Sequence, residues 1–220
     1  MMPLVHELSH SLAEHHLSHL RSIDTTPAAF RQHVKVLSML LAAEVTRGLA
    51  TEACTITTPI ETIAARQLLG RVAVVPILRA GLGMVDPVTD LIPEAEVWHL
   101  GLYRDEETSQ PVRYYDKMPR DNPVSAALVL DPMLATGGSA SLAIETLKEW
   151  GVSHICMLSI IAAPEGIERL TTNFPDVPVY TCVIDEKLNS QNFIVPGLGD
   201  AGDRLFNTGC RDAPAGEGVG

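Results

Sequence analysis

The residues best suited to bind a ligand lie in one short segment, where an apolar run ends in an acid and a glycine-rich turn. After the run 126–130 come Asp131, Pro132, Met133, Leu134, Ala135, Thr136, Gly137, Gly138 and Ser139. The two glycines would let several backbone N–H groups approach a phosphate closely, and a helix beginning at Ser139 would add the positive end of its dipole. The segment therefore predicts a phosphate-binding loop between a strand and a helix.

Other interpretations of this segment stay open. Neither G-x-G-x-x-G nor G-x-x-x-x-G-K-[ST] occurs in it, which disfavours a dinucleotide-binding fold or a P-loop kinase. Thr-Gly-Gly-Ser could be a plain tight turn, and Asp131 could cap that turn. The acid at the end of the strand favours the ligand-binding interpretation.

Two arginines that follow apolar runs are the next candidates. Arg79 lies in the glycine-rich stretch 76–84, and Arg104 follows the run 97–103, where α/β proteins place ligand contacts. A guanidinium offers forked donors that suit a phosphate. Each arginine could instead be a solvated loop residue, and for Arg104, within Arg-Asp-Glu-Glu, the sequence alone does not decide.

Several segments together resemble a known enzyme family. Asp131 to Ser139 resembles the PRPP (5-phosphoribosyl 1-pyrophosphate) loop of type I phosphoribosyltransferases. The sequence of this segment is similar to that of the uracil phosphoribosyltransferases, in which a proline, here Pro132, stands where most of the class have a second acid. Residues 76–84 resemble the family's pyrophosphate loop, 101–104 its second basic contact and 196–203 its uracil loop; with 162–166 they cover most of residues 21–208. Phe193 stands where Tyr is common in the family.

The resemblance implies an enzyme that transfers the phosphoribosyl group of PRPP to N1 of uracil, giving UMP and pyrophosphate. It implies that Arg79 and Arg104 hold the pyrophosphate, that Asp131 contacts the ribose hydroxyls, and that the whole segment from Asp131 to Ser139 binds PRPP. Asp200 is assigned to the PRPP side, through Mg2+ or the ribose. These four charged residues would carry catalysis by position and charge.

By the same resemblance, uracil contacts Ile194, Gly199, Asp200 and Ala201, whose backbone N–H and C=O groups would pair with the edge of the base. A base with an amino group where uracil has a carbonyl would bring donor against donor and leave buried groups unpaired. Asp200 could otherwise belong to a simple Gly-Asp turn. The resemblance also implies a cis peptide bond before Ala80.

Cofactor and partners follow from the resemblance as well. Mg2+ is expected to bind with PRPP rather than in a dedicated protein site, and the loop 104–123 is expected to close over PRPP. A homodimer or a higher homo-oligomer is expected, because the N-terminal helices and residues 51–60 would otherwise leave apolar faces beside the sheet. Some relatives are activated by GTP, and the sequence offers no feature that tests GTP activation here.

Charge and composition limit the other classes of partner. The 220 residues contain 16 Lys and Arg against 27 Asp and Glu, a formal charge of −11, and no basic run that would grip nucleic acid. An RNA-binding regulator of this fold, and a phosphoribosyltransferase for another base, remain the alternatives. The four cysteines are scattered and predicted to be reduced, and no run approaches the ~20 apolar residues of a membrane span. A cytoplasmic protein without membrane contact is expected.

Histidines near the start of the chain have a spacing that zinc sites use. His6 and His10, and His15 and His19, would each place two imidazoles on one helical face. No third ligand and no H-E-x-x-H motif is evident. The prediction is a solvated helix without a metal site.

A repeating order of apolar run, turn and amphipathic stretch must position these segments. Thr26 and Pro27 mark the start of a helix whose apolar face recurs up to Gly48. Strands are predicted at 72–77, 97–103, 126–130, 155–161 and 179–184, a short strand within 51–60, and helices at 82–91, 138–150 and 164–173.

The pattern predicts an α/β fold with a mostly parallel central sheet flanked by helices, in a single domain over 1–208. This domain would comprise an N-terminal helical arm (1–50), a core sheet (71–185) and a C-terminal base-binding hood (186–208). A flexible tail would follow at 209–220.

Overall fold

A parallel sheet forms the centre of the molecule. The computed structural model describes residues 4–104, 111–115 and 121–208, with backbone alone for 102–104 and 111–115. In order across the sheet lie β1 (Val5–Glu7), β11 (Val179–Ile184), β10 (His154–Ala162), β8 (Ala126–Leu130), β4 (Val72–Pro76) and β5 (Glu96–Val97), and β9 (Met133–Leu134) also pairs with β10. Every one of these pairings is parallel. The predicted fold class is confirmed.

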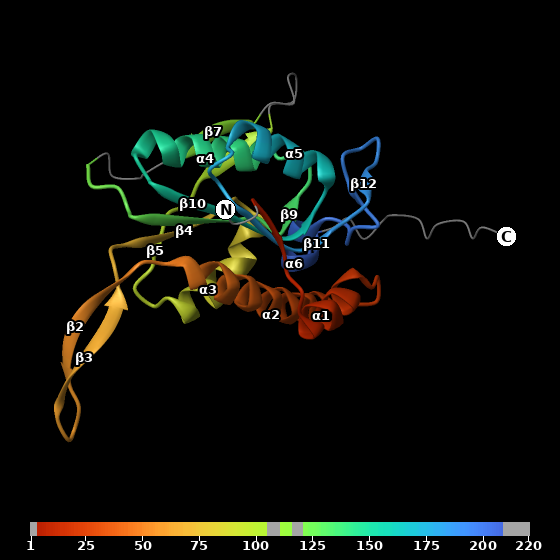
Figure 1. Ribbon diagram of the computed structural model, residues 1–220. Coiled ribbons are helices and arrows are strands. Elements are labelled where there is room, and N and C mark those ends of the chain that lie inside the picture. The colour runs from red at the N-terminus through yellow and green to blue at the C-terminus, as the bar shows by residue number, and fades with distance from the viewer. Residues whose placement is uncertain (1–3, 105–110, 116–120, 209–220) are drawn as a thin grey trace.

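Helices cover both faces of this sheet (Figure 1). On one face lie α1 (Ser11–Arg21), α2 (Pro27–Val45), the short 3-10 turn η2 (Ala80–Met84), α3 (Val85–Leu91) and α6 (Ala201–Phe206). On the other lie α4 (Gly138–Trp150) and α5 (Pro164–Asn173). Each face of the sheet has its own hydrophobic core. In β4, Val72 and Val74 pack in the core on the α2 side and Ala73 and Val75 in the core on the α4 side, because successive side chains of a strand point to opposite faces.

Helix α2 shows why the sequence folds locally as predicted. The Thr26 hydroxyl accepts a hydrogen bond from the Ala29 N–H at 3.3 Å, and Pro27 occupies the first turn, where its missing N–H costs nothing. The apolar positions of the predicted face, among them Phe30, are all buried. The helix ends at Val45 and continues as the 3-10 turn η1 (Thr46–Gly48).

A two-stranded hairpin projects from the body of the molecule (Figure 1). It consists of β2 (Thr51–Thr57) and β3 (Thr62–Leu68), which are antiparallel and pair only with each other among the described strands. The predicted strand within 51–60 is confirmed. Its partner strand was not predicted, because neither strand buries a face on this chain and so the alternation of apolar residues is weak.

Two other predicted elements differ in the structure. The single strand at 97–103 is wrong: β5 ends at Val97, Leu100 makes an isolated bridge to Ile77, and β6 (Gly101–Arg104) pairs antiparallel with β7 (Pro111–Tyr115) outside the main sheet. The departure from the main sheet depends on the antiparallel pairing of β6 with β7, a strand in the charged and proline-rich segment that the sequence analysis treated as a loop. The N-terminal segment begins with β1, a strand absent from the sequence prediction.

The last part of the described chain crosses the carboxyl ends of the strands. It contains β12 (Lys187–Leu188), β13 (Ile194–Val195) and α6, in the region predicted to form the hood. The predicted tail 209–220 and most of the predicted closing loop 104–123 lie outside the described residues. Within the part of the chain that the structure describes, no helix has the length and apolar character needed to cross a bilayer.

Candidate active site at the carboxyl ends of the strands

Two predicted ligand-binding loops meet where β4 and β8 end. The Ile77 N–H, just after β4, donates to the Leu130 carbonyl at 2.9 Å. The loop that follows lies so close that a Cβ added at Gly81 would stand 2.3 Å from that same carbonyl oxygen. The parallel register therefore places the segment of Arg79 beside Asp131, at the edge where α/β proteins bind ligands.

The segment from Asp131 to Ala140 surrounds a small hollow. Its residues line a cavity of about 170 Å³, and α4 begins within it at Gly138, where the helix predicted for 138–150 begins. Gly137 is the residue before the helix and has a φ of 74°, a left-handed conformation that glycine adopts without strain. A Cβ at this position would also lie 3.1 Å from the Gly166 carbonyl oxygen, and a Cβ at Gly166 would lie 2.4 Å from the Ala135 carbonyl oxygen, so both positions favour glycine.

Asp131 is half-buried at the end of β8 and lines this cavity. Its Oδ1 accepts from the Met133 N–H at 3.3 Å, so the residue does cap the turn. Burial of the carboxyl raises the pKa of Asp131 to about 7, and the Met133 hydrogen bond opposes this only in part. The carboxyl is thus a turn cap and also a perturbed group facing a cavity, which is typical of functional positions.

Arg79 and Asp200 come together through the start of α6. The Asp200 carboxylate caps that helix by accepting from the Asp203 N–H at 2.8 Å, as the Gly-Asp turn alternative envisaged. Arg79 Nη2 lies 3.6 Å from Asp203 Oδ1, and a Cβ at Gly202 would be 3.9 Å from the same Nη2. The Arg79 side chain is 62% exposed, which leaves it accessible to a ligand.

The Arg79 loop contains a cis peptide bond, at a different position from the one predicted. The cis peptide bond joins Leu78 to Arg79, one bond before the position predicted ahead of Ala80. A motif resemblance identifies the loop, but residue types do not indicate which non-proline bond in it is cis. Arg104 is the last residue of β6, and its side chain lies outside the described part of the structure.

The residues predicted to contact uracil flank a tight turn. Ile194 is buried in β13, and Ala201 is the buried first residue of α6. Between them, the Val195–Pro196 bond is cis and Gly199 has a φ of 79°. The structure therefore places Gly199, Asp200 and Ala201 in one stretch next to the Arg79 loop, with Ile194 on the far side of the turn.

Three polar residues that support this turn were not identified from the sequence. Asp185 directly follows β11, as Asp131 follows β8, and that shared position was a usable signal. Arg21 and Arg204 donate to the backbone of the turn at Gly197 and Leu198. Nothing local indicated Arg21, whose partner Asp185 lies 164 residues further along the chain.

The histidines are arranged differently from the prediction. His6 lies in β1, where its ring stacks on Tyr180 at 4.4 Å between centroids, and His10 caps α1, so this pair does not share a helical face. His15 and His19 do share a face of α1, and their rings join those of His16 and His33 in one cluster. Among the described residues, no group of three or more His, Cys, Asp or Glu side chains could hold a metal ion.

Residues 7–208 of the sequence match the uracil phosphoribosyltransferase family. The chain belongs to this family. A uracil phosphoribosyltransferase of Roseiflexus sp. (strain RS-1) is 54% identical over 91% of this chain and 96% of its own length. Those of Natranaerobius thermophilus and Streptococcus mutans are 52% and 51% identical, over 94% and 91% of this chain and 100% and 97% of their own lengths.

A solved structure shares this fold. The AQ2163 protein of Aquifex aeolicus superimposes with a TM-score of 0.87 at 35% identity, covering 93% of this chain and 98% of the other. The uracil phosphoribosyltransferase family thus accounts for almost the whole described chain, including all the loops at the carboxyl edge of the sheet. The RNA-binding alternative is not favoured by these relatives.

Proposed function

We propose that the chain transfers the phosphoribosyl group of PRPP to N1 of uracil. The N1–C1′ bond forms, the bond from C1′ to the diphosphate oxygen breaks, pyrophosphate leaves with that electron pair, and the N1 proton is released. The observation that carries the proposal is the meeting, at one edge of the sheet, of the 131–139 cavity, the Arg79 loop and the 194–201 turn. The membership of the chain in the family gives these three parts their substrates.

In this proposal the cavity holds the 5′-phosphate. Backbone N–H groups around Gly137 and the amino end of the 13-residue helix α4 supply donors and a positive potential. Asp131 then accepts from the ribose hydroxyls, and its negative charge stabilises the electron-poor ribose as the bond to diphosphate lengthens. Arg79 and Arg104 stabilise the charge that develops on the departing diphosphate.

The base is held by backbone groups of Ile194, Gly199 and Ala201, with Asp200 between the base and PRPP. Two of these residues are buried, so any polar group of the base that lacks a partner there would be costly. Uracil offers its carbonyls and an N–H on one edge, and a base with an amino group in place of a carbonyl would be rejected.

Mg2+ is proposed to enter with PRPP. Asp131 and Asp200 offer carboxylate oxygens, the donor type that Mg2+ prefers, and two carboxylates suit an ion that keeps water and phosphate ligands. These two residues would hold the ion against the substrate. When bound, Mg2+ would neutralise charge on the diphosphate.

The proposal includes a homodimer formed through the hairpin. Ile60 at the hairpin tip is 93% exposed, and Ile56, Ile63, Leu68 and Leu69 are also exposed apolar side chains. At the base of the hairpin, Leu68, Leu69 and neighbouring apolar residues line a cavity of about 270 Å³. Such a concentration of exposed apolar surface is typical of an interface, and a second copy of the chain is the proposed occupant.

GTP activation and a cytoplasmic location stay predictions. A titration of GTP against the initial rate of UMP formation tests the first. Microscopy of a tagged chain in its native cell tests the second.

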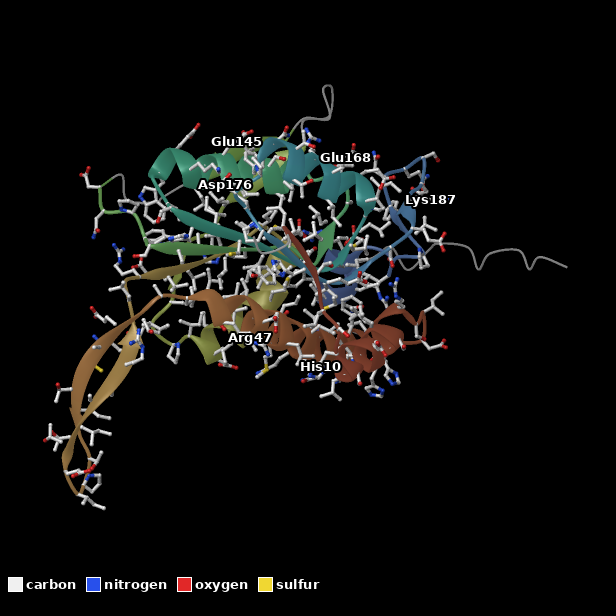
Figure 2. All side chains as sticks on the ribbon, in the orientation of Figure 1. His10, Arg47, Glu145, Glu168, Asp176 and Lys187 are labelled. Atoms are coloured by element: carbon white, nitrogen blue, oxygen red, sulfur yellow. The ribbon has the colours of Figure 1, made fainter. Side chains whose placement is uncertain are left out.

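A panel of nucleobases tests the proposed reaction. With PRPP and Mg2+, uracil should give UMP with a kcat/KM at least about a thousandfold above that for cytosine, hypoxanthine or orotate. Arg79→Ala should lower kcat/KM for PRPP by about a hundredfold. Arg47→Ala is the matched control, because the ion pair that Arg47 makes in the described part of the chain is with Glu44 at the end of α2, and Figure 2 places it on the α2 side. Faster turnover of another base would contradict the proposal.

A further inference from the structure

The end of helix α1 is tied to the turn that carries the proposed uracil contacts. Arg21 is the last residue of α1, and its Nη1 donates to the Gly197 carbonyl at 2.8 Å and to Asp185 Oδ2 at 2.9 Å. Its Nη2 donates to Asp185 Oδ1 at 2.5 Å. One guanidinium therefore binds both a carboxylate in forked geometry and the backbone of the turn.

Asp185 completes this arrangement from the other side. Its Oδ2 also accepts from the Gly197 N–H at 3.0 Å, so both backbone polar groups of Gly197 are occupied. Gly197 itself is folded back against β13, since a Cβ added there would lie 2.1 Å from the Ile194 carbonyl oxygen. The ion pair thus holds the point at which the chain reverses between Ile194 and Gly199.

The position of Asp185 is set by the sheet. It directly follows β11, and its N–H extends the parallel ladder by donating to the Ala162 carbonyl at 2.8 Å. The Asp185 side chain is only 3% exposed and that of Arg21 is 25% exposed. A buried ion pair adds little to stability compared with a well-packed apolar pair, so its presence here points to a positional role.

A second arginine secures the next residue of the turn. Arg204 Nη1 donates to the Leu198 and Leu20 carbonyls, each at 2.7 Å, and its Nη2 donates to the Ser22 carbonyl at 2.6 Å. Leu20 and Ser22 flank Arg21 at the carboxyl end of α1. The backbone at positions 197 and 198 is therefore anchored to α1, and the base must be read by other residues of the turn.

We propose that Arg21 and Asp185 are positioning residues for recognition of the base, a role that rests on the proposed function of the 194–201 turn. They fix Gly197, and through it the directions in which the Ile194, Gly199 and Ala201 backbone groups point. The PRPP cavity is lined by residues from 131 to 140, whereas the hydrogen bonds described for the Arg21 and Asp185 side chains join them to each other and to Gly197. The pair therefore acts on the turn that binds the base and leaves the 131–140 cavity for the 5′-phosphate unchanged.

Kinetics of single and double variants test this role. Arg21→Met with Asp185→Leu replaces the ion pair by apolar side chains, so the chain should fold while Gly197 loses both partners. KM for uracil should rise at least tenfold, and KM for PRPP should stay within twofold. Asp185→Asn, which keeps an acceptor for the Gly197 N–H, should give a smaller rise. Arg21→Lys, which keeps the charge without the fork, should also be intermediate.

Asp176→Asn is the matched control. It breaks the Lys148–Asp176 pair at 2.6 Å on the α4 and α5 side of the molecule, where Figure 2 shows Asp176. Both KM values should remain those of the wild type. If the double variant folds, by its thermal unfolding curve, and its KM for uracil stays within twofold, or both KM values rise equally, the positioning role is wrong. If the wild type itself forms no UMP, the proposed function fails first, and this role fails with it.

Discussion

Asp131 combines a structural and a chemical role in one carboxyl group. It closes the turn after β8, and it lies where burial raises its pKa to about 7. Near neutral pH the free protein therefore holds this group partly protonated. Ribose hydroxyls and a cation would favour the carboxylate, so substrate binding is coupled to loss of that proton.

The pH dependence of PRPP use should report this group. A protonated Asp131 cannot accept from both ribose hydroxyls, so kcat/KM for PRPP should fall about tenfold per pH unit as the pH drops below about 7. Asp131→Asn should be slow at every pH and show a flatter profile. Initial rates between pH 5.5 and 9 measure both, and a wild-type profile that is level from pH 8 to pH 6 would count against the role of Asp131.

The stability of the chain should depend on Asp131 in the opposite direction to activity, because the protonated carboxyl favours the folded state. Because burial raises the pKa of Asp131 in the folded chain, the unfolded state loses this proton first, so stability falls as the pH rises from about 4 to about 7 and then levels off. Asp131→Asn should therefore increase the free energy of unfolding at pH 8 by about 2 kcal/mol, and the gain should nearly vanish at pH 4. Urea unfolding at the two pH values measures this difference. A variant less stable than the wild type at pH 8 would refute it.

At the residue level, sequence reasoning succeeded where a signal was local. Asp131 and Gly137 belong to one continuous segment whose residues indicate a turn between a strand and a helix, and this segment lines a cavity in the structure. Arg21 and Asp185 could not be paired, because their contact spans 164 residues and depends on where the end of α1 lies in the folded chain. The role of the Arg104 side chain and the predicted contacts with bound ligands stay predictions.

The junction between β8 and α4 depends on a backbone shape rather than on a side chain. Gly137→Ala would force an L-residue to a φ of 74° and bring its Cβ to 3.1 Å from the Gly166 carbonyl oxygen. We expect a loss of about 1–2 kcal/mol in unfolding free energy and a higher KM for PRPP, with a smaller effect on KM for uracil. Gly48→Ala is the control, since a Cβ there meets nothing within 4 Å. Equal effects of the two substitutions on KM for PRPP would contradict this account.

Helices α1 and α2 meet at the histidine cluster, which makes their contact sensitive to acid. The Nδ1 atoms of His16 and His33 lie 2.8 Å apart, so one must donate to the other, and protonation of both rings would set donor against donor. Burial, and then the neighbouring histidines, lower the pKa of both residues. The folded state thus binds fewer protons than the unfolded state, and stability should be lost as the pH falls through about 6.5.

His33→Gln should remove much of that acid sensitivity. The drop in Tm between pH 7.5 and pH 5 should be smaller in the variant than in the wild type, because glutamine does not titrate. His99→Gln, at an exposed position between β5 and β6, is the control and should retain the wild-type drop. The interpretation is wrong if the His33 variant loses as much Tm as the wild type.

Elements were predictable where one buried face and clear end signals coincide. The strands 126–130 and 179–184 and the helices 138–150 and 164–173 have in the structure the bounds predicted for them. The prediction failed for β1, a strand of three residues at the sheet edge, and for the run 97–103, which leaves the sheet at Leu100. β1 depends on pairing with β11, which is distant in the sequence, and the run 97–103 divides because β6 pairs with β7; local periodicity encodes neither partner.

For the whole molecule, the projecting hairpin carries the prediction of a dimer. Ile56 and Ile63 are directly opposite each other on one face of the hairpin and are 46% and 39% exposed. Ile56→Asp should place a charge in the proposed interface and raise the dimer dissociation constant at least tenfold. Thr55→Asp, on the opposite face of the same strand, should change it little. Sedimentation of all three proteins at micromolar concentration measures this, and a monomeric wild type would contradict the dimer.

The central claim concerns the whole carboxyl edge of the sheet: the cavity at 131–139 holds the 5′-phosphate of PRPP while Arg79 lies beside its diphosphate. A crystal structure of the chain with PRPP and Mg2+ tests this most directly. The account predicts phosphate oxygens within hydrogen-bond distance of the backbone N–H groups at 136–139. PRPP bound elsewhere, or an empty cavity at concentrations that support turnover, would contradict it.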